Sequence, residues 1–269
     1  MRLSGAHVLL TGATGTIGSR LATELAARGA RLTLVARTAP DLTALAAPLG
    51  AHALPADLTD TDRLPDLLAA AEDHHGPVDV LVHNAAAESA ALLTDVRDGE
   101  VARTVALNLV APLELTRLVL PSMLRRGHGH VVAVSSLAAV ATFPGLTLYG
   151  ATKAGLSAAM AGLRLELRGT GIGTTTVELG PVASPMMERI ATEPTSAAAF
   201  GRARSLGVLP LLDPDDVATA VAEAVDADRR HLTLPRRAAP LAAMSQAPRS
   251  VVRLALTGLR PAHHEAARA

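Results

Sequence analysis

The chain contains one tyrosine, Tyr149, and one lysine, Lys153, four residues apart in the stretch LYGATKAG (148–155). The chain has 24 arginines beside this one lysine, so the position of the lysine points to a chemical requirement. Residues i and i+4 lie on one face of a helix. A phenol has a pKa of about 10, and a nearby ammonium lowers it. The pair therefore predicts proton exchange with an alcohol or ketone; the alternative is an exposed helical pair without a role.

A glycine-rich turn, TGATGTIG (11–18), joins the first expected strand to the first expected helix. Glycine adopts positive φ and lets the backbone approach a phosphate closely. The N-terminus of the helix adds free N–H groups and a partial positive charge. The turn predicts a site for the pyrophosphate of a dinucleotide, and the alternative is a tight turn without a ligand. The residues expected to contact the dinucleotide are Gly12, Thr14, Gly15, Thr16, Ile17 and Gly18.

A single arginine, Arg37, stands at the end of the second expected strand. Dinucleotides with a free ribose usually meet an acidic residue there, but the preceding residue is Ala36 and the next acid is Asp41. A guanidinium suits a 2′-phosphate through paired hydrogen bonds. Arg37 therefore favours NADP(H) over NAD(H), while the alternative is a solvated surface arginine.

Short apolar runs alternate with longer amphipathic runs along the chain. Over 17–29, for example, Ile17, Leu21 and Leu25 form one stripe and Gly29 ends the helix. Strands are expected at 7–11, 31–37, within 51–59, and at 78–84, 130–136, 173–179 and 231–234; helices are expected at 17–29, 42–50, 62–76, about 100–126, 148–169 and 213–227. Such alternation predicts an α/β fold, a Rossmann-like doubly wound parallel sheet of about seven strands with helices on both faces.

Composition argues against several classes of protein. Lys plus Arg equals Asp plus Glu at 25 each, so no net charge steers the chain toward nucleic acid. No cysteine is present for a disulfide or a thiolate. The histidine pairs His74–His75 and His263–His264 are adjacent and are not expected to face one another, so no metal site is predicted. Neither a secretion signal nor a membrane span is recognised, and a cytoplasmic protein is expected.

Taken together, these residues resemble the short-chain dehydrogenase/reductase family in its compact form, over roughly residues 5–235. The motifs that carry the resemblance are TGATGTIG, Asp57 in ADLT, HNAA (83–86), Asn108, Ser136, the Tyr149–Lys153 pair and LGPVASPM (179–186). The resemblance implies one domain over 1–239 and hydride transfer between a nicotinamide and a carbonyl or secondary alcohol.

The resemblance also implies a role for each matched position. Tyr149 would exchange a proton with the substrate oxygen, and Lys153 would bind the nicotinamide ribose and lower the tyrosine pKa. Ser136 would bind the substrate carbonyl, with Ser135 as the alternative, and Asn108 would hold a water in a proton relay. The other implied cofactor contacts are Asp57 and Leu58 at the adenine, Asn84 and Ala85 near the adenine ribose, Ala86 in the loop under the cofactor, and Val182 and Ser184 at the carboxamide.

Two motifs depart from the compact pattern. The middle glycine of the turn comes one place early and Thr16 fills the usual slot, a spacing that resembles the extended branch of epimerases and dehydratases. His83 and Ala86 replace an asparagine and a glycine of the usual NNAG. These departures leave two alternatives open: an extended-type epimerase or dehydratase, and a non-catalytic protein that senses NADP.

The segment 183–212 would cap the substrate, by resemblance. Its Met186, Met187, Ile190, Phe200 and Leu206 favour a bulky, apolar carbonyl or alcohol, unless they only pack against the body. The helices about 100–126 and 148–169 carry small residues and, by resemblance, predict a homodimer or homotetramer. Residues 240–269 are expected to form a C-terminal extension that packs on the body, on a partner subunit or on a membrane surface.

Overall fold

Seven short apolar runs pair as parallel strands of one sheet, in the order β3-β2-β1-β4-β5-β6-β7. The computed structural model describes residues 2–141, 143–192, 194–205, 209–240 and 242–243. The strands are β1 (His7–Thr11), β2 (Arg31–Ala36), β3 (His52–Pro55), β4 (Val80–His83), β5 (Gly129–Ser136), β6 (Ile172–Leu179) and β7 (His231–Leu234). The strand order reverses beside β1, the point at which doubly wound sheets bind ligands. The predicted α/β fold is thus confirmed.

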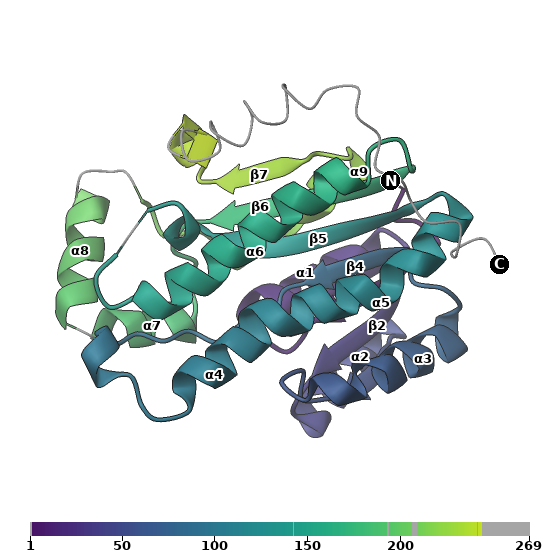
Figure 1. Cartoon of the computed structure of the whole chain (residues 1–269), viewed down its shortest axis with the longest axis horizontal. Helices are drawn as coiled ribbons and strands as arrows, with labels where there is room; N and C mark the ends of the chain where they lie inside the picture. Colours follow the sequence, from purple (N-terminus) through teal and green to yellow (C-terminus); the bar gives the residue numbers. More distant parts are fainter. Residues whose placement is uncertain (1, 142, 193, 206–208, 241, 244–269) are drawn as a thin grey trace.

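Helices cover both faces of the sheet (Figure 1). One face carries α1 (Thr16–Ala27), α2 (Ala39–Leu49) and α9 (Pro214–Asp226), and the other carries α3 (Leu64–His75), α5 (Ala111–Arg126) and α6 (Thr147–Glu166). The short 3-10 helices are η1 (Thr61–Arg63), η2 (Leu93–Asp95), η4 (Leu137–Ala139) and η5 (Arg236–Ala238). The α9 helix begins as its sequence predicts, because the Asp213 carboxylate accepts a hydrogen bond from the backbone N–H of Asp215 at 2.8 Å.

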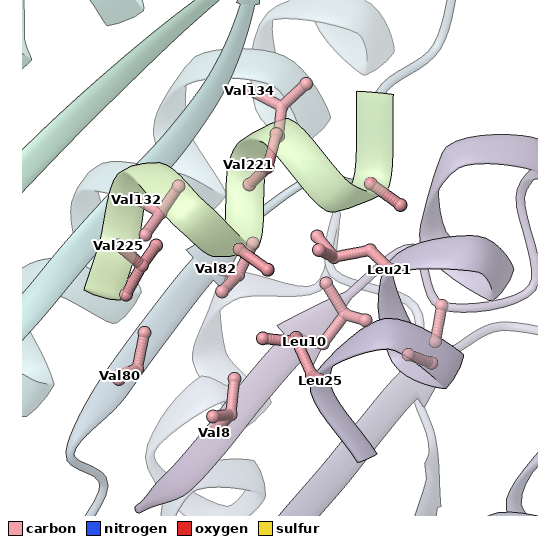
Figure 2. Packing of buried hydrophobic residues seen from close by; sticks show 14 of the residues in the cluster. Val8, Leu10, Leu21, Leu25, Val80, Val82, Val132, Val134, Val221 and Val225 are labelled. Carbon is pink, nitrogen blue, oxygen red and sulfur yellow. The ribbon is translucent and has the colours of Figure 1, made fainter. Parts of the chain in front are cut away.

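The core against α1 and α9 is built from β-branched and leucine side chains (Figure 2). Val8 and Leu10 of β1 meet Leu21 and Leu25 of α1. Val221 of α9 packs in the same cluster over β4 and β5, the strands that follow β1 in the sheet. All five side chains are at most 1% exposed. Each such side chain stabilises the fold by about 1.5–3 kcal/mol relative to exposure. This packing fixes the carboxyl ends of the strands, where the predicted site residues lie.

The helix expected at about 100–126 contains an irregularity. It begins as α4 (Glu100–Val105), widens into a π-helical turn, η3 (Ala106–Val110), and continues as α5. Such turns often mark functional positions, and this one contains Asn108. By length and hydropathy the stretch Glu100–Arg126 could also cross a membrane. In this fold its α5 part packs on the sheet through buried residues such as Leu115 and Val119, as a core helix does.

Two helices occupy most of the segment 183–212, which the sequence analysis treated as a loop. They are α7 (Pro185–Thr192) and α8 (Pro194–Ser205), which stand at one end of the sheet in Figure 1. The side chain of Ser184 accepts a hydrogen bond from the Met187 backbone N–H at 3.3 Å and so caps α7. Leu206 lies outside the described residues, as does most of the expected C-terminal extension, so the boundary at 240 stays a prediction.

Candidate active site

Helix α6 brings Tyr149 and Lys153 onto one buried face. Their exposed fractions are 9% and 2%. The Lys153 Nζ donates a hydrogen bond to the Val134 carbonyl on β5 at 2.8 Å and lies 5.8 Å from the centroid of the Tyr149 ring. An ammonium carries three N–H donors, so this arrangement leaves further donors beside the phenol. The structure therefore rules out the exposed helical pair.

Burial dominates the acid–base properties of these two side chains. It raises the pKa of Tyr149 to about 12, although a hydrogen bond with Ser136 lowers it and the charge of Glu88 raises it further. Burial also lowers the pKa of Lys153 to about 8. The expected lowering of the tyrosine pKa by the ammonium is thus not found in the protein alone, because desolvation of the phenolate outweighs an ammonium 5.8 Å from the ring centroid.

The adjacent serines at the end of β5 point in opposite directions. The Ser135 hydroxyl donates to the Lys153 carbonyl at 3.2 Å and lies 2.8 Å from the Ser157 hydroxyl, inside the core. The Ser136 hydroxyl accepts from the Ala138 backbone N–H at 3.1 Å and lines a pocket together with Tyr149. Both serine residues line this pocket, but the Ser136 side chain is the one that hydrogen-bonds the phenol.

Asn108 is fully buried. It lines neither the pocket that contains Ser136 and Tyr149 nor the cavity beside the glycine turn. Its amide Nδ2 donates to the Ala87 carbonyl at 2.8 Å and to the Thr152 hydroxyl at 3.1 Å, and its Oδ1 accepts from the Ala87 N–H at 2.8 Å. The Thr152 hydroxyl in turn donates to the Tyr149 carbonyl at 2.8 Å. The side chain therefore ties the loop after β4 to helix α6, and its role in a water relay stays a prediction.

The glycine turn after β1 is shaped by two close approaches. A Cβ on Gly12, whose φ is +67°, would lie 2.7 Å from the Ala85 Cα, and a Cβ on Gly18 would lie 2.1 Å from the Gly12 carbonyl oxygen. Gly15 precedes α1, whose first turn has neither a side-chain cap nor an acidic residue. An uncapped helix N-terminus, with glycines at 12, 15 and 18 where the backbone can approach closely, fits the pyrophosphate of a dinucleotide. Thr16, which fills the place where the compact family usually has a glycine, is the first residue of α1. The close contact with the Gly12 carbonyl is made by Gly18.

Two adjoining cavities collect most of the predicted site residues. The first, the tyrosine pocket, is lined by Ser136, Tyr149, Lys153 and Val182. The second, the glycine cleft, is lined by Gly12, Thr14, Gly15, Thr16, Ile17, Gly18, Arg37, Leu58, Asn84, Ala85, Ala86 and Ser184. Both cavities share Ile17, Asn84, Ala86, Ser184 and Met186, so they form one continuous site.

Asp57 is the predicted cofactor residue that lines neither cavity. Its carboxylate accepts hydrogen bonds from the backbone N–H and the hydroxyl of Thr59, at 3.0 and 2.8 Å, and these bonds lower its pKa. The charges of Arg103 and Arg37 also lower this pKa, and Arg37 itself lines the cleft. Its neighbour Leu58 is buried and forms part of the wall.

Three further residues shape the site and were missed by the sequence analysis. The Thr11 hydroxyl accepts from the backbone N–H groups of Asn84 and Ala85 at 3.1 and 3.2 Å, which locks the glycine turn to the end of β4. Glu88 and Arg189 both line the glycine cleft and form an ion pair with each other. Thr11 is the first residue of the TGATGTIG stretch and so offered a signal, whereas nothing in the sequence pairs Glu88 with Arg189.

Histidines gather away from this site. The rings of His52 and His74 stack with their centroids 4.0 Å apart, and those of His74 and His75 meet edge to face at 4.5 Å. The expectation that His74 and His75 do not face one another is therefore wrong, because the end of α3 lets both rings turn toward His52. Within the described part of the chain, no group of three or more His, Asp or Glu side chains could hold a metal ion.

Comparison with known sequences identifies one family. A model of the family described as short chain dehydrogenase matches residues 6–195. A glycine betaine reductase of Emericella nidulans is 35% identical over 224 residues, which cover 81% of this chain and 17% of the relative. A ketoacyl reductase of a Nostoc species is 38% identical, and a fatty acyl-CoA reductase of Mycobacterium tuberculosis is 34% identical; each match covers 69% of this chain and 66% of the relative. The chain thus spans a minor part of the first relative and about two thirds of the other two.

Solved structures show the same likeness. A short-chain dehydrogenase from Streptomyces avermitilis superposes with a TM-score of 0.76 at 29% identity, covering 94% of each chain. A metagenomic short-chain oxidoreductase, solved in complex with NADP, superposes with a TM-score of 0.70 at 28% identity, covering 87% of this chain and 97% of its own.

Proposed function

Because the chain belongs to the short chain dehydrogenase family, whose members are oxidoreductases that use nicotinamide cofactors, we propose that it is an NADP-dependent reductase of carbonyl compounds. It would transfer a hydride between the nicotinamide and a carbonyl or secondary alcohol. The observation that carries the proposal is the continuity of the two cavities: Ser136, Tyr149 and Lys153 line a pocket that opens into the glycine cleft.

The residues divide the chemistry of the reacting oxygen among themselves. Ser136 donates a hydrogen bond to the substrate carbonyl, and Tyr149 gives that oxygen its proton. With a pKa of about 12, the phenol is protonated at neutral pH, which is the state that a proton donor in reduction requires. The ammonium of Lys153, anchored on Val134, lies beside the phenol and stabilises the phenolate left behind. A bound nicotinamide would supply the hydride and, when oxidised, a second positive charge.

The glycine cleft would hold the cofactor. Its turn and the first turn of α1 receive the pyrophosphate, while Asn84, Ala85 and Ala86 form the floor beside them. Asp57 and Leu58 would stand at the adenine end together with Arg37; of these, Leu58 and Arg37 line the cleft. Val182 and Ser184 would face the nicotinamide carboxamide. A relative in structure solved with NADP supports this assignment.

The preference for NADP depends on Arg37, which is exposed and lines the cleft. We expect Arg37→Asp to weaken NADPH binding by about ten- to hundredfold and to leave NADH binding within about threefold, because a charge-assisted hydrogen bond contributes about 1.5–3 kcal/mol. Titration of cofactor fluorescence measures both constants directly. An unchanged ratio of the two constants would remove Arg37 from the assignment.

Tyr149→Phe tests the reaction itself. Loss of a general acid should lower the rate of carbonyl reduction by about 100- to 10,000-fold, while NADPH binding is retained because the ring stays in place. The assay follows NADPH consumption with aliphatic ketones and aldehydes of increasing chain length. A variant as active as the wild type would contradict the proposal, and full cofactor binding without turnover of any carbonyl by the wild type would favour a sensor.

The substrate we propose is bulky and apolar. The tyrosine pocket, a cavity of about 120 Å³, is walled by Phe143, Leu146, Met186 and Ile190. It adjoins an apolar groove of about 690 Å³ under α7 and α8, and the two cavities share Pro181, Ser184, Met187, Phe200 and Leu209. The pocket alone is smaller than most ligand sites, which span about 300–1,000 Å³. Two relatives are named for acyl substrates, a ketoacyl reductase and a fatty acyl-CoA reductase, which supports a carbonyl with a hydrocarbon tail.

A homodimer or homotetramer in the cytoplasm completes the proposal. The stretch from α4 to α5 presents Val101, Val110 and Leu113 to solvent, each more than 40% exposed. Large apolar side chains grouped on one helical stretch are typical of a surface that another subunit covers.

A further inference from the structure

An ion pair spans the glycine cleft between two elements far apart in sequence. Arg189 of α7 contacts Glu88, in the loop after β4, through its guanidinium Nε. The Glu88 side chain is 15% exposed and that of Arg189 is 60% exposed. Because the carboxylate is held in the wall and the guanidinium reaches in from solvent, Arg189 is the partner that is free to move.

The charges around the cleft make this pair unusual. Among the residues that line the cleft in the described structure, the charged ones are Arg37, Glu88 and Arg189. Glu88 therefore places a carboxylate in a cavity whose proposed ligand carries two negative charges on its pyrophosphate. In the ion pair that carboxylate is neutralised by Arg189, which keeps the cleft open to an anion.

Arg189 also lines the same cleft as the glycine turn that would receive the pyrophosphate. Ser184, Pro185 and Met186, at the start of the same helix, line the cleft together with Thr14 and Gly15. A guanidinium offers several N–H donors in a planar fork, which suits phosphate oxygens better than it suits one carboxylate oxygen.

From these contacts we infer that Arg189 is a cofactor-binding residue that exchanges Glu88 for the pyrophosphate when the dinucleotide enters, and so fastens α7 over the bound cofactor. Glu88 is the positioning residue that holds the guanidinium at the cleft beforehand. The inference rests on the proposed function, because it takes a nicotinamide dinucleotide as the ligand.

The two arginines of the cleft then differ in what they recognise. Arg37 would contact the 2′-phosphate, which NADPH has and NADH lacks. Arg189 would contact the pyrophosphate, which both dinucleotides have. Arg189→Gln should therefore weaken both cofactors by the same factor, about tenfold, as expected for a hydrogen bond to a charged group. Glu88→Gln should strengthen both by about two- to fivefold, because it removes the competing carboxylate.

The experiment measures dissociation constants for NADPH and NADH by cofactor fluorescence, with wild type, Arg189→Gln, Glu88→Gln and Arg189→Lys. The last variant keeps the charge and should recover part of the affinity. The matched control is Glu188→Gln, which removes a carboxylate from the same helix; Glu188 lines the apolar groove and not the cleft. This control should leave both constants within about twofold.

Equal losses in Glu88→Gln and Arg189→Gln would overturn the inference, since they would show that the ion pair is only a strut between the loop and α7. Unchanged affinities in Arg189→Gln would overturn it as well. A wild type that binds neither dinucleotide would instead overturn the proposed function, so the two failures are distinguishable.

Discussion

Polar side chains are enclosed at both ends of the sheet: histidines at the amino ends of the strands, and Ser136, Tyr149 and Lys153 at the carboxyl end of β5, where helix α6 packs. His7 of β1 is fully buried, with Nδ1 2.7 Å from the Gly76 carbonyl and Nε2 2.9 Å from the Thr33 hydroxyl. His130 of β5 likewise lies with Nε2 2.8 Å from the Thr175 hydroxyl. His7 thus uses both ring nitrogens on the protein's own groups, whereas the buried Nδ1 of His130 has no hydrogen-bond partner and lies 3.5 Å from the Asp228 carboxylate. Tyr149 and Lys153 are also buried and Ser136 is half-buried, yet these three residues line a cavity.

The difference separates two uses of a buried polar side chain. A buried polar group costs free energy unless a hydrogen bond compensates for it. Compensation within the protein makes the group part of the structure, as at the amino ends. A group that lines a cavity keeps capacity for a ligand, as at the carboxyl ends, and its pKa stays shifted by desolvation.

The sharpest way to break this comparison lies in the adjacent serines. Ser136→Ala should lower the rate of carbonyl reduction by about 100-fold, because one hydrogen-bond donor to the reacting oxygen is lost, with little effect on stability. Ser135→Ala should lower the free energy of unfolding by about 1–2 kcal/mol, because its buried partners lose a bond, with the rate within a few-fold. Steady-state kinetics and urea unfolding on both variants measure the two effects. The reverse pattern would show that the hydrogen bond to the phenol does not mark the reacting serine.

Lys153→Met addresses the cost of burying a charge in the pocket. Since burial lowers the pKa of Lys153 to about 8, the folded protein without cofactor disfavours the ammonium. Its stability should therefore rise between pH 8 and the unfolded value of about 10.4, and the Met variant should lack this rise. At pH 7 the variant should be more stable by about 1–3 kcal/mol, reduced by the lost bond to Val134. Urea unfolding followed by circular dichroism measures this, and a less stable variant would show that the ammonium is a net stabilising group.

The smallest effect concerns the histidines at the amino ends. Burial lowers the pKa values of His7, His52 and His75, and neighbouring histidine charges lower those of His52 and His75 further. A lowered histidine pKa means that stability is complete above the unfolded value of about 6.5 and is lost as the pH falls below it. His52→Gln should reduce by about 0.5 kcal/mol the free energy of unfolding that the protein loses as the pH falls. The effect is small because solvent screens the charge on this ring.

Unfolding at pH 7 and pH 5 tests the histidine prediction, with exposed His128→Gln as the control variant. A control that changes the acid loss as much as His52→Gln would contradict a special role for the stacked rings. Cofactor affinity should stay unchanged at pH 7, because His52 lies at the amino end of β3, whereas the glycine cleft lies at the carboxyl ends of the strands.

Much of the fold was predictable because it depends on local patterns. The strand at 7–11 is buried throughout, and α9 starts at its Asp213 cap. The segment 183–212 was harder, since helix α8 has few apolar residues in a regular stripe, and its two helices went unrecognised. The π-helical turn at Asn108 was equally unpredicted, as were the hydrogen bonds of its side chain to Ala87 and Thr152, because those partners are distant in sequence.

The site divides in the same way. Residue types and spacing were enough to single out Tyr149, Lys153 and the glycine turn, because a helical turn and a strand–helix junction fix their geometry locally. Which serine enters the pocket, how far burial moves the pKa of Tyr149, and the meeting of Glu88 with Arg189 were decided only in three dimensions. Each of these depends on desolvation or on contacts between distant segments, and packing alone determines such contacts.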